Sequence, residues 1–256
     1  MNILLNGICG FMGREVVKLC SEGYRGAALA YGVDSRGGDG VYTCLQDVPD
    51  GGIDCIIDFS HHSATESLLD FAIERGLPLV LCTTGHTTDE IFLINNAAKS
   101  IPLFYSGNMS VGIALLIELA KSAALAFPEA NIEIVEKHHT RKLDAPSGTA
   151  LMLADAIRTV RPESYPNCGR SGAGKRDNDE IGIHSIRMGN IVGEHEVIIG
   201  TASQTITLKH EAHTRALFAE GAIAAADFLV GKPSGLYDMR AMLSSETNDA
   251  VITAGG

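Results

Sequence analysis

The chain has 256 residues, of which 45% are hydrophobic and 20% are charged, and this length and composition exclude an intrinsically disordered protein. A chain of this size buries a sizeable core, and we expect two domains. The formal net charge of −11 argues against nucleic acid and anionic membranes as partners, because both are held mainly by basic surfaces.

The first hundred residues alternate short apolar runs with segments of helical spacing. The expected strands are Ile3–Leu5, Ala27–Val33, Ile53–Asp58, Leu79–Cys82 and Ile101–Tyr105, and the expected helices are Arg14–Ser21, Ser63–Arg75 and Thr87–Lys99. Strands and helices that alternate at this spacing predict a doubly wound parallel sheet with right-handed crossovers.

Two helices and a strand are expected in the middle of the chain. The apolar residues of Val111–Leu125 recur at helical spacing, and Pro128 ends that helix. Asn131–Val135 is strand-like, and Thr149–Val160 is typical of a helix that begins at or near Ser147.

The last hundred residues begin with an expected long flexible loop at 163–180, which is rich in glycine and polar residues. Strand-like runs follow at 182–188, 195–199 and 204–209, and they predict a second sheet with mostly antiparallel or mixed pairing. The alanine-rich segment 216–230 is typical of a well-packed helix. Because an apolar helix needs a partner surface, we expect it to return to the first domain.

A glycine-rich turn follows the first predicted strand. Gly7, Gly10 and Gly13 stand where a helix opens, and glycines there let the backbone approach a pyrophosphate at the helix N-terminus. The turn departs from the strict G-x-G-x-x-G pattern at Cys9 and Met12, so the motif alone is weak. An ordinary tight turn is the alternative interpretation.

Acidic and small polar residues at other strand ends support dinucleotide binding. Asp34 ends the second predicted strand, where a carboxylate accepts from the adenosine ribose hydroxyls. Arg36 could instead pair with a 2′-phosphate, so both NADH and NADPH remain candidates. The predicted cofactor-binding residues are Gly7, Ile8, Cys9, Gly10, Phe11, Met12, Asp34, Ser35, Cys82, Thr83, Thr84, Ser106, Gly107, Asn108 and Met109.

The densest chemical signal is the segment 136–150. His138 and His139 offer protons near neutral pH, while Arg141 and Lys142 offer positive charge. The Ser147-Gly148-Thr149 run supplies backbone N–H groups where a helix begins. We expect this loop to bind a dianion beside a proton donor. A solvated basic loop is the alternative, and a metal site is not expected, because no Cys or third His completes one nearby.

Most other histidines are expected to have structural or surface roles. This applies to His61, His62, His184 and His195, whereas His210 and Arg215 remain candidates for the rim of a pocket.

Glu136–Ala150 closely resembles the signature of the 4-hydroxy-tetrahydrodipicolinate reductase family, also called dihydrodipicolinate reductase, of the diaminopimelate and lysine pathway. The likeness extends over essentially the whole chain. It includes the glycine turn, Asp58-Phe59-Ser60, Thr83-Thr84-Gly85, Ser106–Gly112, Arg187–Gly189 with Gly193–Glu196, and Phe218–Ala222 with Gly235–Met239.

The resemblance implies reduction of a cyclic imine dicarboxylate to tetrahydrodipicolinate by NADH or NADPH. It implies that His138 is the proton donor and acceptor and that Lys142 assists protonation. It also implies that residues of the 136–150 loop and one residue at the end of the second domain bind the substrate carboxylates. These residues are His139, Ser147, Gly148, Thr149 and Arg215. Hydride addition builds negative charge on the ring, and a nearby acid quenches it as it forms.

The domain organisation that we expect is a Rossmann-like doubly wound domain, residues 1–109 with 216–256, and an α+β substrate-binding and oligomerisation domain, residues 110–215. By resemblance, the second sheet would build a homotetramer. Cys9 replaces a glycine common in the family, and Phe11 stands where many members carry a basic residue. We therefore expect dual or NADH-leaning cofactor use, with Arg36 as the opposing consideration.

Two other functions are compatible with parts of the sequence. Another two-domain NAD(P)-dependent reductase or amino-acid dehydrogenase would share the first domain and act on a different acid. A dinucleotide-sensing regulator would have no need for His138 and Lys142 together, and their presence disfavours it.

Cysteine use and hydropathy predict a cytoplasmic location. The six cysteines are scattered without a C-x-x-C pair, which is typical of reduced thiols, and no export signal or apolar span of membrane length is visible. Residues 248–256 are expected to be disordered.

Overall fold

The computed structural model describes residues 1–245, so the expectation for 248–256 lies outside the described residues. The chain divides into two compact units. Unit 1 contains Met1–Val111 and the segment that begins at Ala216, and unit 2 contains Gly112–Arg215. Among the described residues, no helix is long and apolar enough to cross a membrane.

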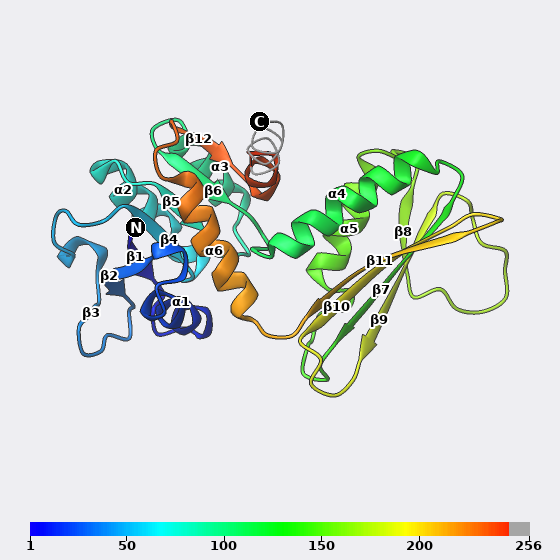
Figure 1. Ribbon diagram of the computed structural model, residues 1–256, viewed down its shortest axis with the longest axis horizontal. Helices are drawn as coiled ribbons and strands as arrows, with labels where there is room; N and C mark the ends of the chain where they lie inside the picture. Colours follow the sequence, from blue (N-terminus) through cyan, green and yellow to red (C-terminus); the bar gives the residue numbers. More distant parts are fainter. Residues whose placement is uncertain (246–256) are drawn as a thin grey trace, which may run out of the picture. The chain divides into compact units, whose positions relative to one another are not determined.

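Unit 1 is built on a seven-stranded sheet in the order β12-β6-β5-β4-β1-β2-β3, and every neighbouring pair is parallel (Figure 1). The strands are β1 (Asn2–Asn6), β2 (Ala28–Val33), β3 (Val41–Tyr42), β4 (Cys55–Asp58), β5 (Leu79–Leu81), β6 (Pro102–Tyr105) and β12 (Gly235–Tyr237). The predicted parallel sheet is confirmed. The strands β3 and β12 were not predicted, because two or three residues carry no periodic pattern.

Helices cover both faces of this sheet. They are α1 (Phe11–Ser21), α2 (Thr65–Arg75), α3 (Thr88–Ala97) and α6 (Ala216–Leu229). Helices α2 and α3 share a buried core with Leu4, Ile56 and Leu103 of the strands, while α6 packs against α1 and the strands β4 to β6. Strand residues point alternately to the two faces, and the consecutive residues Ile3, Leu4 and Leu5 of β1 are all completely buried. Both faces of the sheet are therefore apolar, as in a doubly wound fold.

Local capping signals set the ends of these helices. Thr87 and Glu90 form a capping box at the start of α3, in which each side chain accepts from the backbone N–H of the other. Helix α2 ends at Gly76, whose φ of +62° is the left-handed conformation that glycine adopts without strain. Helix α1 begins at Phe11, three residues before the predicted start, directly after the glycine turn.

Unit 2 has a five-stranded mixed sheet in the order β11-β10-β7-β9-β8. Its strands are β7 (Asn131–His138), β8 (Tyr165–Cys168), β9 (Glu180–Arg187), β10 (Gly193–Gly200) and β11 (Thr205–Ala212). Strand β9 is parallel to β7 and β8, whereas β10 is antiparallel to β7 and β11. The predicted second, mixed sheet is confirmed.

One face of the second sheet is covered by α4 (Val111–Ala126) and α5 (Gly148–Arg158), which lie together beside it (Figure 1). Ile132, Ile134 and Val197 of the sheet share a buried core with Leu116 of α4 and Leu153 of α5. Because side chains alternate along β7, the even-numbered residues of that strand face these helices.

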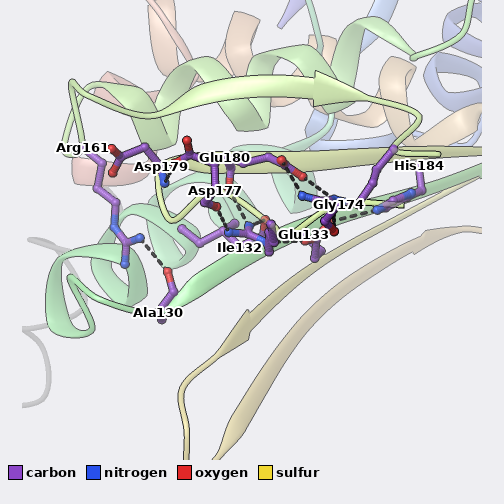
Figure 2. Close-up of polar contacts among 11 residues, drawn as sticks. Ala130, Ile132, Glu133, Arg161, Gly174, Asp177, Asp179, Glu180 and His184 are labelled. Atoms are coloured by element: carbon purple, nitrogen blue, oxygen red, sulfur yellow. Dashed lines mark hydrogen bonds and ion pairs between the residues drawn. The ribbon is translucent and has the colours of Figure 1, made fainter. Parts of the chain in front are cut away.

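The prediction of a long flexible loop over 163–180 is wrong at Tyr165–Cys168, which form β8. The segment contains Pro166 and is mostly exposed, so it has no strand pattern of its own and is ordered by parallel pairing with β9. The rest of the segment is tied to the sheet by ion pairs. Arg170 binds Glu180 at 2.9 Å and Arg176 binds Glu133 at 2.9 Å, among the contacts around Glu133 and Glu180 in Figure 2.

Candidate active site

The turn between β1 and α1 requires glycine. Gly7 has a φ of +84°, and a Cβ there would lie 2.5 Å from the carbonyl oxygen of Phe59. A Cβ on Gly13 would lie 2.3 Å from the carbonyl oxygen of Gly7. The backbone therefore closes tightly at the start of α1, where a helix N-terminus favours an anion.

A cavity of about 560 Å³ opens beside this turn within unit 1. Of the predicted cofactor residues, Gly7, Gly10, Asp34 and Ser35 line it. Arg36, the candidate partner of a 2′-phosphate, also lines it. The other lining residues, which are not among the predicted cofactor contacts, are Asn6, Val33, Thr43, Cys44, Leu45, Gln46, Phe59, Ser60, His61, Ser63, Ala64 and Ser67. For Phe59 and Ser60, the sequence feature that points to this position is the run Asp58-Phe59-Ser60 at the end of a predicted strand. A hollow with a glycine turn and a buried carboxylate fits the adenosine half of a dinucleotide.

Asp34 is paired with Arg36 at the edge of this cavity. Arg36 donates from Nε to Oδ1 at 2.9 Å and from Nη2 to Oδ2 at 3.1 Å, and the backbone N–H of Cys9 donates to Oδ2 at 3.0 Å. The Arg36 guanidinium lowers the pKa of the Asp34 carboxyl to about 2. The Arg36 side chain is 62% exposed, so it can leave this carboxylate when another partner arrives.

The Asp58 carboxylate joins residues at or just after the carboxyl ends of β1, β4 and β5. It accepts from Asn6 Nδ2 at 2.8 Å, Ser60 Oγ at 2.6 Å and Thr83 Oγ1 at 2.5 Å. Burial raises the pKa of Asp58, although these hydrogen bonds act to lower it. The network places the predicted residue Thr83 at the carboxyl edge of the sheet, close to the end of β1.

The remaining predicted cofactor residues do not line that cavity. Cys82 and Met109 are buried. The Ser106 hydroxyl donates to the carbonyl oxygen of Asn108 at 2.8 Å and shapes the turn after β6. The others outside the cavity lining are Ile8, Cys9, Phe11, Met12, Thr83, Thr84 and Gly107.

His138 ends strand β7 of unit 2 and is bound to a buried carboxylate. Its Nδ1 lies 2.6 Å from Oε2 of Glu136, and Arg187 of β9 binds both oxygens of the same carboxylate at 2.6 and 2.7 Å. The backbone N–H of Ser147 donates to Glu136 Oε1 at 3.1 Å. Glu136 therefore contacts both the predicted proton donor and the start of α5.

The N-terminus of α5 lies beside His138. Ser147 is the N-cap, as predicted, and its hydroxyl accepts from the backbone N–H of Ala150 at 3.2 Å. Ser147 Oγ is also 3.0 Å from His195 Nε2, and the rings of His195 and His138 are 5.2 Å apart. Burial lowers the pKa of His195 to about 3, which keeps this ring neutral. Sequence reasoning had not placed His195 beside the site.

The other predicted substrate residues gather around the same loop. Arg215 Nη2 lies 3.3 Å from His139 Nε2, and burial together with the charges of Arg141 and Arg215 lowers the pKa of His139. Lys142 Nζ pairs with Asp144 Oδ1 at 2.9 Å, where Asp144 is more than half exposed. Gly148 is exposed in the first turn of α5, followed by the half-buried Thr149. The loop thus combines cations, imidazoles and a helix N-terminus, which suits a dianion.

Among residues 1–245, no group of three or more His, Cys, Asp or Glu side chains is arranged to hold a metal ion.

Two family models together match nearly the whole chain. Residues 1–109 match the one described as "Dihydrodipicolinate reductase, N-terminus", and residues 112–243 match "Dihydrodipicolinate reductase, C-terminus".

Curated proteins that are similar to this chain are named 4-hydroxy-tetrahydrodipicolinate reductase. A 4-hydroxy-tetrahydrodipicolinate reductase of Clostridium tetani is 42% identical over 96% of this chain and 98% of its own length. One from Caldanaerobacter subterraneus is 44% identical over 93% of this chain and 96% of its own length. Among solved structures, a dipicolinate-bound dihydrodipicolinate reductase from Paenisporosarcina sp. has a TM-score of 0.79 at 23% identity, covering 93% of this chain and 97% of that one, which supports the fold.

Proposed function

Because this chain belongs to the dihydrodipicolinate reductase family, we propose that the residues described above carry out that family's reaction. The chain is an NAD(P)H-dependent oxidoreductase that reduces 4-hydroxy-tetrahydrodipicolinate or dihydrodipicolinate to tetrahydrodipicolinate in diaminopimelate and lysine biosynthesis. Bound NADH or NADPH supplies the hydride. The proposal concerns which residues of the chain bind, orient and protonate.

His138 is the proposed proton donor, with Lys142 assisting. The observation that carries this assignment is that Glu136 contacts both His138 Nδ1 and the backbone N–H of Ser147, so a proton donor and an anion-binding helix start share one partner. Negative charge that develops on the reduced ring is quenched by a positioned acid. Lys142 adds positive charge, since its present partner Asp144 is exposed and can be replaced by a substrate carboxylate.

We propose that the loop before α5, together with the first turn of that helix, binds the substrate carboxylates. Arg215 and His139 supply side-chain donors, and the backbone N–H groups at the start of α5 supply the rest. Such contacts are charge-assisted and fix the ring in one orientation. The proposed set is His139, Ser147, Gly148, Thr149 and Arg215.

Unit 1 with the segment after Ala216 is the proposed dinucleotide-binding domain, and unit 2 the proposed substrate-binding and oligomerisation domain. The glycine turn and the Asp34–Arg36 pair border a cavity within unit 1, which supports adenosine binding there. We assign the residues Cys82 to Thr84 and Ser106 to Met109, at other strand ends of the same sheet, to the rest of the cofactor.

A coupled assay tests these roles. Dihydrodipicolinate synthase supplies the unstable substrate, and nicotinamide absorbance follows turnover. We expect His138→Gln to lower kcat by about 10²- to 10⁴-fold, the range that general acids contribute, with little change in KM for the dinucleotide. Lys142→Ala should also lose activity.

The control is His184→Gln, which removes an imidazole from the opposite face of the same sheet and should retain activity. Wild-type kcat in His138→Gln would remove that residue from proton transfer. No oxidation above the enzyme-free rate in the wild type would contradict the proposed function altogether.

We also propose that the enzyme is a cytoplasmic homotetramer. All six cysteines are unpaired thiols, which suits a reducing compartment. The face of the second sheet opposite α4 and α5 carries Val135, Ile186 and Ile198 between charged residues, and apolar side chains on a sheet face favour burial against a partner.

A further inference from the structure

The Glu136 carboxylate is completely buried, and protein donors surround it. Its Oε2 accepts from His138 Nδ1 at 2.6 Å and from Arg187 Nη1 at 2.7 Å. Its Oε1 accepts from Arg187 Nη2 at 2.6 Å and from the backbone N–H of Ser147 at 3.1 Å. The donors come from β7, β9 and the start of α5, so one side chain joins three parts of unit 2.

Glu136 is held in its ionised form. Burial raises the pKa of a carboxyl group, but the hydrogen bonds from His138, Arg187 and Ser147 outweigh burial and hold the pKa of Glu136 well below its usual range. An ionised carboxylate can only accept hydrogen bonds. The His138 nitrogen that faces Glu136 must therefore carry a proton, whether the ring is charged or neutral.

The other ring nitrogen of His138 is then the one that exchanges protons. A Cβ on Gly193 would lie 3.1 Å from His138 Nε2, so the glycine at the start of β10 leaves space next to that nitrogen. The neighbouring ring of His195 is neutral and bonded to Ser147, so it does not compete as an acid near neutral pH.

Arg187 connects the same carboxylate to the loop before α5. Besides its two bonds to Glu136, it donates from Nη2 to the carbonyl oxygen of Asp144 at 2.7 Å. Together with the Ser147 N–H bond, this contact fixes both ends of the segment 144–147. The position of His138 relative to the first turn of α5 is thus determined through Glu136.

We infer that Glu136 is a positioning residue, which holds His138 as the Nδ1–H tautomer and holds the first turn of α5 at a set place beside it. The inference rests on the proposed function of His138. In the reaction, the imidazolium transfers its Nε2 proton to the reduced ring of the substrate, and the neutral ring that remains keeps its Nδ1 proton on the Glu136 hydrogen bond.

The same strand offers a matched control. Glu133, three residues before Glu136, also binds an imidazole and a guanidinium, with His184 Nε2 and Arg176 Nε each 2.9 Å from its carboxylate (Figure 2). Its side chain lies on the opposite face of the sheet and is 28% exposed. Glu133→Gln therefore removes the same charge from a similar cluster that does not contact His138.

Nitrogen-15 NMR of histidine-labelled wild-type enzyme tests the tautomer directly. We expect neutral His138, identified by comparison with His138→Gln, to carry its proton on Nδ1. A neutral His138 with the proton on Nε2 would overturn the inference. This measurement needs no variant at Glu136 and no turnover, so it stands even where Glu136→Gln fails to fold.

Kinetics of Glu136→Gln provide the second test. The amide can donate to Nδ1, which favours the wrong tautomer, and we expect kcat to fall on the order of a hundredfold while the KM for the dinucleotide is unchanged. The KM for the dicarboxylate should rise, because the start of α5 also loses its partner. Glu136→Asp keeps an acceptor and should recover part of the kcat. Glu133→Gln should keep wild-type kcat.

A double variant separates this inference from the proposed function. If Glu136 acts on kcat through His138, then Glu136→Gln in the His138→Gln background causes no further loss of kcat. Equal losses in Glu133→Gln and Glu136→Gln, or wild-type kcat in Glu136→Gln while His138→Gln is inactive, would overturn the inference alone. A fully active His138→Gln would overturn the proposed acid, and with it the role of Glu136.

Discussion

At the scale of single residues, the Asp34–Arg36 pair bears on cofactor choice. The Arg36 guanidinium occupies both carboxylate oxygens of Asp34, so the acceptors that a ribose hydroxyl would use are held by the cation that a 2′-phosphate would attract. The two cofactors therefore require opposite behaviour from Arg36. It must leave Asp34 for NADH, and it gains a second anion with NADPH.

We predict that Arg36→Ala lowers the NADPH to NADH ratio of kcat/KM by about tenfold, the loss expected for one charge-assisted bond at an exposed site. The kcat/KM for NADH should stay within a few fold of its original value, because Asp34 is then released. Steady-state kinetics with both cofactors measure the ratio. The control is Arg158→Ala, which removes an exposed arginine from unit 2. An unchanged NADPH to NADH ratio in Arg36→Ala would show that Arg36 does not determine the choice of cofactor.

The buried His195 beside the candidate site makes the free energy of unfolding depend on pH in the acidic range. Burial, followed by the charge of His138, lowers its pKa to about 3, whereas an unfolded histidine titrates near 6.5. Between these pH values the unfolded chain binds one more proton than the folded one. The free energy of unfolding therefore rises with pH across this range, and acidification below about 6.5 costs up to about 1.4 kcal/mol per pH unit from this ring.

We predict that His195→Gln makes the free energy of unfolding less dependent on pH below neutrality. The amide can still bond Ser147, and it does not titrate. Urea unfolding at neutral and mildly acidic pH measures the slope for each protein. The control is His61→Gln, which replaces an exposed ring and should leave the pH dependence of the free energy of unfolding as in the wild type. If His195→Gln also keeps the wild-type pH dependence, the lowered pKa assigned to His195 is contradicted.

At the scale of elements, the position of α1 against the glycine turn depends on Gly13, which has no side chain. Gly13 lies in the first turns of α1, and a Cβ there would meet the carbonyl oxygens of Gly7 at 2.3 Å and Ile8 at 2.6 Å. Both are backbone atoms of the turn that borders the cavity, so they move only if the turn opens. The packing of one helix residue thus controls the shape of the proposed dinucleotide site.

We predict that Gly13→Ala raises the KM for the dinucleotide and destabilises the protein by about 1–3 kcal/mol, the usual cost of overpacking. Kinetics and thermal unfolding measure the two effects. Gly174→Ala, where an added Cβ meets nothing within 4 Å, is the control and should change neither. Unchanged KM and stability in Gly13→Ala would show that the turn tolerates displacement.

At the scale of the whole molecule, unit 2 is inserted into the chain of unit 1, since the segment after Ala216 returns to the first sheet. Each unit has its own buried core. In unit 2, helices cover one face of the sheet, and the other face carries ion pairs of Lys137 with Glu194 and Glu196 among apolar side chains. A face of this mixed character suits an interface between copies of the chain.

We predict that light scattering at neutral pH gives a mass about four times that of one chain, as expected for a closed symmetric assembly. Ile198→Asp, which places a charge on that sheet face, should lower the mass. Leu125→Asp, on an exposed position of α4, is the control and should not. A monomeric wild type at micromolar concentration would contradict the proposed tetramer.

Much of the fold could be predicted from the sequence because its signals are local. Apolar periodicity identified the strands β1, β4, β5 and β6, and Ser147 identified the start of α5. The elements that were missed depend on distant partners. Strand β8 has an exposed segment with a proline, and only its pairing with β9 makes it a strand.

By itself, the sequence determined the two kinds of sheet, the glycine turn and the loop that carries His138, the proposed proton donor, because periodicity and motif spacing are properties of neighbouring residues. Only the tertiary structure decided how Glu136, Arg187 and Ser147 meet around one carboxylate, and that His195 lies beside it. These residues are far apart in the chain, and their contacts depend on strand register and on the docking of α5. Register places whole faces of side chains together, and no short pattern records which residue across the sheet will be the partner.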